Sequence, residues 1–189
     1  MAEKKKKRLK KEDWLEAALE VLKSEGVEGV YVEPLAKRIG ITKGSFYWHF
    51  KDRPALLTEL LEYWREKSTG GIISFIKDLP DKDGNGDPTD KLWELMKYIN
   101  NFEPDAYDPA IRAWSVSNKD AAEAMKEVDE KRLDIIYNLI VEKGLDDIAA
   151  IVRARMIYFY ITGETATGLK EAKGFSLIRA KMRYDIITR

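Results

Sequence analysis

The chain has 189 residues, and its 33 basic side chains balance its 33 acidic ones, so its formal net charge at pH 7 is zero. A chain of this length can bury a core of its own, and the absence of cysteine excludes a disulfide framework, a thiolate metal site and a cysteine nucleophile, which favours a reducing, cytoplasmic compartment. The longest apolar run, Met156 to Ile161, is far shorter than the roughly 20 residues that a membrane span requires, so we expect no membrane partner.

The N-terminus opens with a basic segment, residues 1–11, which lacks apolar periodicity and is expected to be a disordered arm. It is either a solubility feature or an arm that binds phosphates or enters a minor groove. Residues 1–53 carry 13 Lys and Arg against 9 Asp and Glu, whereas the rest of the chain carries 20 against 24. A basic head on an acidic body suits a protein that places one end on a polyanion, although an ordinary solvated surface would show a similar difference.

A first helix is predicted by the apolar residues that recur at helical spacing from Trp14 to Leu22. Asp13 is placed to cap the start of this helix, and Gly26 is placed to end it. No strand pattern competes with this interpretation.

Two short helices follow, at about residues 33–39 and 43–48. Gly40 can adopt the positive φ of a tight turn between them, and the hydroxyl of Thr42 can cap the second of the two. Short helices joined in this way form a helix-turn-helix unit, which indicates DNA binding.

The last helix of this unit has two distinct faces. Phe46 and Phe50 lie four residues apart and share a face that we expect in the core. A cation, a glycine, hydroxyls and a large aromatic on the opposite face suit the major groove. Packing of Trp48 against a neighbouring helix remains the alternative, because large aromatics are usually buried. The predicted exposed face consists of Lys43, Gly44, Tyr47 and Trp48, with Ser45 and His49 at its flanks.

Asp52 is expected to cap a long fourth helix that continues toward Ile76, and a surface loop is expected at residues 81–88. The loop begins like a calcium-binding loop of the EF-hand type, but Leu92 stands where a bidentate Glu is required. We therefore prefer a plain inter-helix loop, with calcium binding as the alternative.

The rest of the chain predicts five further helices, which makes the fold class all-α. Gly144 and Gly168 are placed to end two of them, and Asn118 and Asp108-Pro109 to begin two. The helices are expected near residues 91–101, 109–116, 120–143, 146–167 and 171–188.

Residues 32–57, VEPLAKRIGITKGSFYWHFKDRPALL, resemble the DNA-binding segment of TetR-family regulators. The family pattern runs as an apolar-Ala pair, a Gly-apolar-Ser/Thr turn, then Tyr-x-His-Phe and a cation before a Leu-Leu helix. This order is much more specific than any single short motif. The resemblance implies a helix-turn-helix DNA-binding domain at 12–53, joined by a long fourth helix to a helical ligand-binding and dimerisation domain at 54–189.

The resemblance also implies which residues contact DNA. Tyr31 departs from the family pattern, which often has Ser or Thr there as a cap, so a cap at that position is in doubt. His49, the only histidine, has no partners in the sequence that would indicate catalysis or a metal site. Carried over by position, the base-facing residues are Lys43, Gly44, Ser45 and Trp48, and the phosphate contacts are Thr42, Tyr47, His49, Lys51 and Arg53.

The predicted helix at 146–167 is apolar around much of its circumference, which indicates burial on several faces. With the last helix it can form a four-helix interface with a second copy of the chain; an ordinary core within a monomer is the alternative. A set of aromatic and apolar residues earlier in the domain could line a pocket for a small apolar or aromatic ligand, or could simply be core. This set is Trp93, Tyr98, Phe102, Trp114, Met125 and Tyr137.

The sequence contains no phosphate-cradling glycine loop, no nucleophile elbow and no paired histidine and carboxylate spacing, so we expect neither an enzyme nor a cofactor. The predicted function is a homodimeric transcription regulator that binds a palindromic double-stranded DNA operator and, as a repressor, is released by a small ligand. A helical protein-interaction bundle without ligand response is the alternative.

Overall fold

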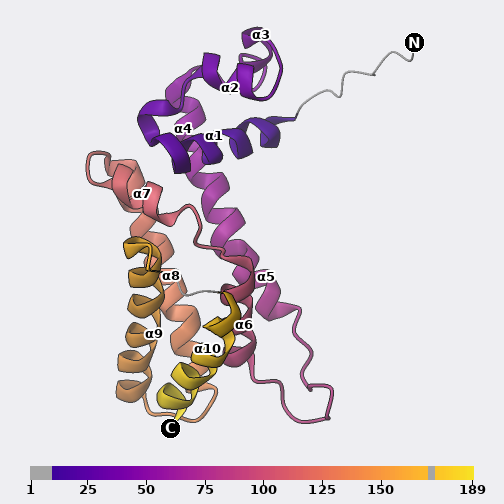
Figure 1. Ribbon diagram of the computed structural model, residues 1–189, viewed down its shortest axis with the longest axis vertical. Coiled ribbons are helices and arrows are strands. Elements are labelled where there is room, and N and C mark those ends of the chain that lie inside the picture. Colours follow the sequence, from indigo (N-terminus) through magenta and orange to yellow (C-terminus); the bar gives the residue numbers. More distant parts are fainter. Residues whose placement is uncertain (1–9, 170–172) are drawn as a thin grey trace.

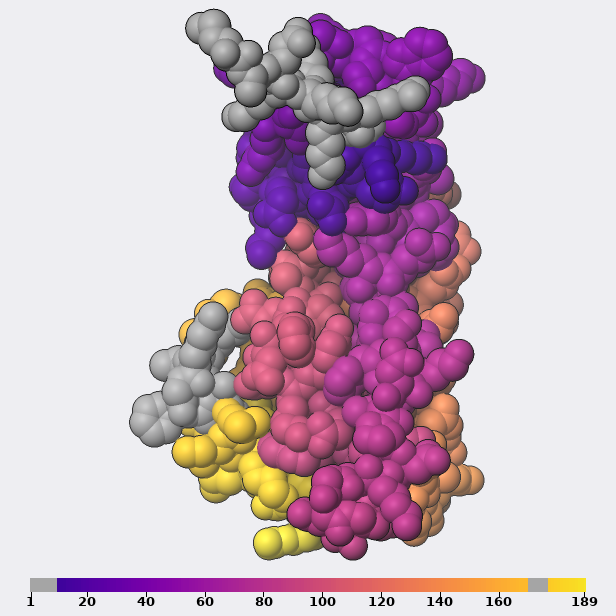
Figure 2. Space-filling model, turned by 90° about the vertical axis from the view of Figure 1, so that its right-hand side faces the viewer, coloured from indigo at the N-terminus to yellow at the C-terminus, as the bar shows by residue number. Residues whose placement is uncertain are grey.

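A computed structural model of the chain describes residues 10–169 and 173–189. Within these ranges the chain is helical, apart from turns, loops and one isolated β-bridge between Lys82 and Pro88. A small head of short helices lies at one end of a long helical body (Figures 1 and 2). Most of the predicted basic arm lies outside the described residues. None of the described helices is long and apolar enough to cross a membrane.

The head begins with α1 (Lys11–Glu25), which starts earlier than predicted. Asp13 stands in the first turn, not at the cap position, and its carboxylate accepts a hydrogen bond from the backbone N–H of Lys10 at 2.5 Å. Gly26 ends α1 with φ +74°, as predicted, and the 3-10 turn η1 (Val27–Gly29) follows. The seven apolar residues that α1 buries form the centre of the head.

The helix-turn-helix unit consists of α2 (Val32–Arg38) and α3 (Lys43–Phe46). Gly40 has φ +73° between them, which confirms the predicted turn. The helix α3 is shorter than predicted, because residues 47–49 continue as a turn. Thr42 occupies the cap position, but its hydroxyl makes no capping hydrogen bond there, contrary to our expectation.

A long helical rod connects the head to the body, and it consists of α4 (Arg53–Arg65), the π-helical turn η2 (Glu66–Gly70) and α5 (Gly71–Lys77). The carboxylate of Asp52 accepts a hydrogen bond from the backbone N–H of Ala55 at 2.9 Å, so Asp52 is the predicted cap. Ser68 in the π turn donates its hydroxyl to the carbonyl of Trp64 at 2.6 Å. The rod is a continuous stretch of chain that runs from the head into the body (Figure 1).

Five helices complete the body close to their predicted positions, and Gly144 and Gly168 have the positive φ expected of helix ends. In the loop before them, Asp83 accepts hydrogen bonds from the N–H groups of Asn85 and Asp87, as in a plain turn. The five helices are α6 (Lys91–Phe102), α7 (Asp108–Ser115), α8 (Lys119–Val141), α9 (Asp147–Thr167) and α10 (Lys173–Thr188).

Two hydrophobic cores hold the described residues together. The first core contains α1 to α4 but also Ile111 and Trp114 of α7 and Met125 of α8. The second lies among α5, α6, α8, α9 and α10. Since the first core crosses the domain boundary predicted at residues 53 and 54, the head does not pack as a separate body. It rests on α7 and α8.

Candidate nucleic-acid interface and its connection to the body

The outer surface of the head carries the residues that we call the recognition face, namely Lys43, Gly44, Tyr47 and Trp48. Trp48 is 87% exposed and Tyr47 is 63% exposed, whereas Phe46 is fully buried. Phe46 packs edge-on against Trp14 of α1, with ring centroids 5.3 Å apart. Trp48 therefore does not pack on a neighbouring helix, and its indole ring is available to a partner.

Lys43 of the recognition face forms an ion pair with Glu33 at the start of α2. The hydrogen bond from Lys43 is the main cause of a lowered pKa of Glu33. Both side chains are more than half exposed, and an exposed pair of this kind contributes little to stability. A phosphate or a guanine edge can therefore replace Glu33 as the partner of Lys43 at low cost.

Arg53 has a structural contact that the sequence did not reveal. Its Nε donates to the carbonyl of Val30 and its Nη2 to the carbonyl of Val27, each at 2.7 Å. Its guanidinium also lies over the ring of Tyr31, 4.7 Å from the centroid. Tyr31, which is no side-chain cap for α2, instead helps Arg53 to fasten the start of α4 to η1.

The other predicted contact residues lie on or beside the same end of the head. Exposed positions offer side chains to a partner directly, while half-buried ones need only a small displacement. Thr42 and Lys51 are exposed, and Ser45 and His49 are half-buried.

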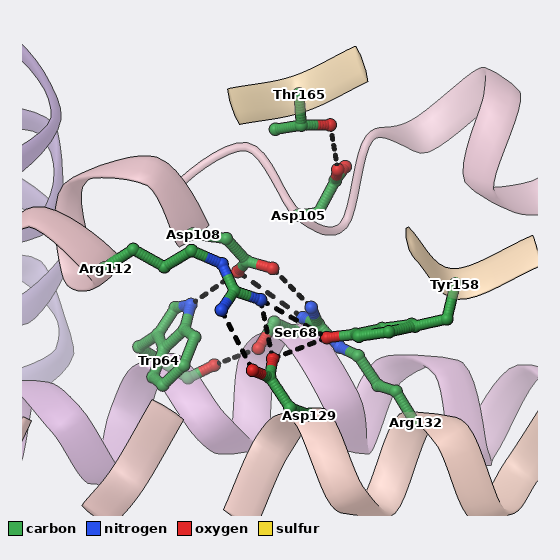
Figure 3. Close-up of polar contacts among 9 residues, drawn as sticks. All are labelled: Trp64, Ser68, Asp105, Asp108, Arg112, Asp129, Arg132, Tyr158 and Thr165. Carbon is green, nitrogen blue, oxygen red and sulfur yellow. Dashed lines mark hydrogen bonds and ion pairs between the residues drawn. The ribbon is translucent and has the colours of Figure 1, made fainter. Parts of the chain in front are cut away.

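The head is connected to the body by a buried polar cluster at the lower end of α4 (Figure 3). Trp64 of α4 donates its indole N–H to Asp108 of α7 at 3.2 Å, and Arg132 of α8 forms an ion pair with the same carboxylate. Asp108 and Arg132 are 5% and 7% exposed. Burial raises the pKa of Asp108 above its ordinary value, and the Arg132 charge opposes that rise. We call these three residues the junction.

A second, more exposed ion pair lies beside the junction (Figure 3). Arg112 of α7 binds both carboxylate oxygens of Asp129 of α8, at 2.9 and 2.6 Å. Tyr158 of α9 donates its hydroxyl to the same carboxylate at 2.5 Å. Burial, together with this hydrogen bond, raises the pKa of Tyr158 to about 12. Helices α7, α8 and α9 are thus joined by charge-assisted hydrogen bonds directly below the head.

A cavity with a volume of about 490 Å³ lies among α6, α9 and α10. A second hollow of about 40 Å³ shares Ile99, Asp105 and Ile161 with it and reaches Asp108 and Arg132. The cavity therefore extends from the body toward the junction. Besides the shared residues, its lining includes Met96, Phe102, Met156, Tyr160, Glu164 and Arg183.

The structure does not bring together the six residues predicted to line a ligand pocket, and only Phe102 lines the cavity. Trp114 and Met125 are buried in the first core, where they support the head. The other three make contacts elsewhere: Trp93 packs on Tyr184 with centroids 5.4 Å apart, Tyr98 stacks on Phe75 at 4.3 Å, and Tyr137 donates to Asp147 at 3.1 Å.

An apolar surface covers the outer sides of α9 and α10. Only one side of α9 is buried within the chain, through residues such as Ala150, Ala154 and Ile157. The exposed residues, which we call the apolar face, are Ile148, Ile151, Val152, Met156 and Phe159 of α9, and Leu177, Ile178, Met182 and Ile186 of α10.

Comparison with known proteins gives an independent result on the head. The sequence pattern of the family described as bacterial regulatory proteins, tetR family, matches residues 15–60. The HTH-type transcriptional regulator AcrR of Shigella flexneri is 31% identical over 86 residues, which are 45% of this chain and 37% of AcrR. The class C tetracycline repressor protein of Escherichia coli is 42% identical over 55 residues, which are 29% of this chain and 25% of the repressor. The chain thus matches well under half the length of these curated relatives.

The whole fold also has a close counterpart. A transcriptional regulator from Saccharomonospora viridis, solved in complex with choline, superposes with a TM-score of 0.70 over 94% of both chains, at 16% identity. The similarity to the tetR family thus covers residues 15–60, which include the helix-turn-helix unit. The curated relatives named here are transcriptional regulators.

The junction yields a prediction about stability. Asp108→Ala leaves the buried Arg132 guanidinium and the Trp64 indole N–H without a partner, so it should lower the free energy of unfolding by about 3 to 5 kcal/mol. The double variant Asp108→Leu with Arg132→Met removes both charges and should cost clearly less. Urea unfolding of both variants provides the measurement. A loss below about 1 kcal/mol for Asp108→Ala would show that the junction does not hold the head to the body.

Proposed function

We propose that the chain is a sequence-specific DNA-binding transcription regulator that represses in the bacterial cytoplasm until a small ligand releases it from its operator. The observation that carries this proposal is the recognition face: an almost fully exposed Trp48 and a weakly paired Lys43 on a tetR-family domain. On binding, the apolar surface of the exposed indole would be removed from water in a groove of DNA, which favours the complex.

In this proposal the base contacts come from Lys43, Gly44, Ser45 and Trp48. A side chain added at Gly44 would meet only the hydroxyl of Thr42, at 3.8 Å, so glycine here serves the approach of a partner and not the packing of the chain. Phosphate contacts come from Thr42, Tyr47, His49, Lys51 and Arg53. The bonds of Arg53 to two carbonyls use its Nε and Nη2, which leaves Nη1 for a phosphate.

Lys43 and Arg53 provide the test of these roles. Lys43→Ala should cost about 1 to 3 kcal/mol on the best operator and much less on scrambled DNA, because it removes a base contact. Arg53→Ala should weaken both duplexes about equally and lower the slope of log affinity against log salt by about 1. It should also lower thermal stability, because the hydrogen bonds to the carbonyls of Val27 and Val30 are lost.

The measurement is binding of each variant to an operator selected from random DNA and to its scrambled version, at several salt concentrations. Glu33→Gln is the control, because it removes the ion pair of Lys43 and keeps the lysine; it should leave operator affinity unchanged or higher. If Lys43→Ala weakens both duplexes equally while Arg53→Ala spares the scrambled one, the base-facing set is wrong.

We further propose that the apolar face joins two copies of the chain into a dimer that binds a palindromic operator. Large apolar side chains exposed in number are typical of interaction surfaces, and here they lie on two helices, α9 and α10, that can form a four-helix interface with their symmetry mates. Two recognition faces at a fixed separation would then read two half-sites about 34 to 36 Å apart, or a multiple of that distance.

A glutamate in the apolar face tests the dimer. Ile151→Glu places two charges in the interface and should convert the dimer into monomers at micromolar concentration, as measured by light scattering. Val116→Glu is the matched control, because Val116 is 89% exposed at the end of α7, outside the apolar face. A monomeric wild-type chain would refute the dimer, and so would an Ile151→Glu variant that remains dimeric.

The cavity supports the proposed response to a ligand. Its volume of about 490 Å³ lies in the range of small-molecule sites, and its lining is mostly apolar with a few polar groups. Asp105 lines it, and the backbone N–H of Asp108 donates to the carbonyl of Asp105 at 3.0 Å. A ligand against Asp105 would act on the loop that carries Asp108, and through the junction on Trp64 of α4. The ligand shifts the head only as far as it prefers one arrangement of the junction over another.

A further inference from the structure

Asp105 differs from the other buried carboxylate of the described chain. Asp108 has a buried guanidinium as its partner, whereas no Lys or Arg in the described ranges forms an ion pair with Asp105. Asp105 is nevertheless only 8% exposed. Its one hydrogen-bond donor is the hydroxyl of Thr165 in α9, which reaches Oδ2 (Figure 3). A carboxylate that is buried without a cation is unfavourable unless something else supplies the charge.

The position of Asp105 indicates where a compensating positive charge can come from. The side chain stands in the wall that the cavity and the smaller hollow share, so a molecule in either space reaches it. The charge of Asp105 is also among the causes, after burial, that raise the pKa of Asp108. Asp105 therefore lies close enough to act on both the cavity and the junction.

Other polar groups of the cavity also favour a positively charged ligand. Glu103 and Glu164 are two further carboxylates in the lining, and Glu164 accepts a hydrogen bond from the hydroxyl of Tyr160 at 2.7 Å. The cation of the lining, Arg183, is already engaged, because its guanidinium lies 4.5 Å from the centre of the Tyr160 ring and donates to the same hydroxyl at 3.2 Å. Apolar side chains, among them Phe102 and Met156, make up most of the other walls.

We propose that the cavity binds an amphipathic organic cation, whose ammonium group pairs with Asp105 and whose apolar part fills the space among α6, α9 and α10. This inference rests on the proposed function, because it names the class of ligand to which the regulator responds. A carboxylate ligand would meet Asp105 and Glu164 with the wrong sign of charge, and a neutral ligand would leave Asp105 unpaired. The aromatic ring of Phe102, which also lines the cavity, suits a cation as well.

The test uses three probes with one apolar body and different head groups: 4-phenylbutylamine, 4-phenylbutanol and 5-phenylpentanoate. Calorimetry on the full chain without DNA should show that the amine binds about tenfold or more tightly than either of the others. Asp105→Asn should remove about tenfold or more of the amine affinity and leave the alcohol unaffected. Asp134→Asn, an exposed carboxylate on α8, is the matched control and should bind the amine as the wild type does.

The unfolding temperature gives a second readout. Without a probe, Asp105→Asn should unfold at the same temperature as the wild type or higher, because the amide removes an unpaired charge and still accepts the Thr165 hydroxyl. Equal affinities for the three head groups, undiminished amine binding by Asp105→Asn, or a clear fall of its unfolding temperature would each overturn the inference. Operator binding that ignores the bound amine would count against the proposed ligand response only.

Discussion

The ion pair of Asp108 and Arg132 lies where the head meets the body, and the position of the head depends on it. The two charges come from different helices, α7 and α8, and the same carboxylate holds the indole N–H of Trp64 in α4. Because a buried charge is tolerated only while its partner is in place, these three helices cannot separate one at a time. The first core adds an apolar contact between the same elements through Ile111 and Trp114. The head that carries the recognition face is therefore held in place by α7 and α8 of the body.

The arrangement also indicates how the proposed ligand site in the body would influence DNA binding. The loop between α6 and α7 carries Asp105, which lines the cavity, and it ends at Asp108 of the junction. In this proposal a change at Asp105 would reach Asp108 through the hydrogen-bonded turn between them. The rod of α4, η2 and α5 would then convert a shift near Trp64 into a displacement of the head. Two heads in a dimer would lose the spacing of their half-sites by the same motion.

Much of the fold is predictable from the sequence because its signals are local. Helical periodicity, the turn at Gly40 and the cap at Asp52 depend on residues close to each other in the chain, and the structure confirms them. The four-residue spacing of Phe46 and Phe50 also predicts that both are buried, and the structure confirms this although α3 ends at Phe46.

The sequence was least informative about polar contacts between distant segments. Asp108 was interpreted as the start of a helix, but its partner Arg132 lies 24 residues away, and no local pattern connects the two. Arg53 likewise reaches back to η1, which gives it a structural contact besides its proposed phosphate contact. The predicted pocket residues were chosen as aromatics, whereas most of them pack in the two cores and the cavity is marked by carboxylates.

The central claim is that the junction couples the cavity to the recognition face, and the variant Trp64→Phe tests it most directly. Phenylalanine keeps an aromatic ring in the first core and removes the indole N–H that binds Asp108, together with the five-membered part of the indole ring. The measurement is operator affinity with and without saturating 4-phenylbutylamine. In the wild type the amine should weaken operator binding about tenfold or more, whereas in Trp64→Phe, with both ligands still bound, the effect should fall to about threefold or less. An undiminished effect in Trp64→Phe would contradict the account.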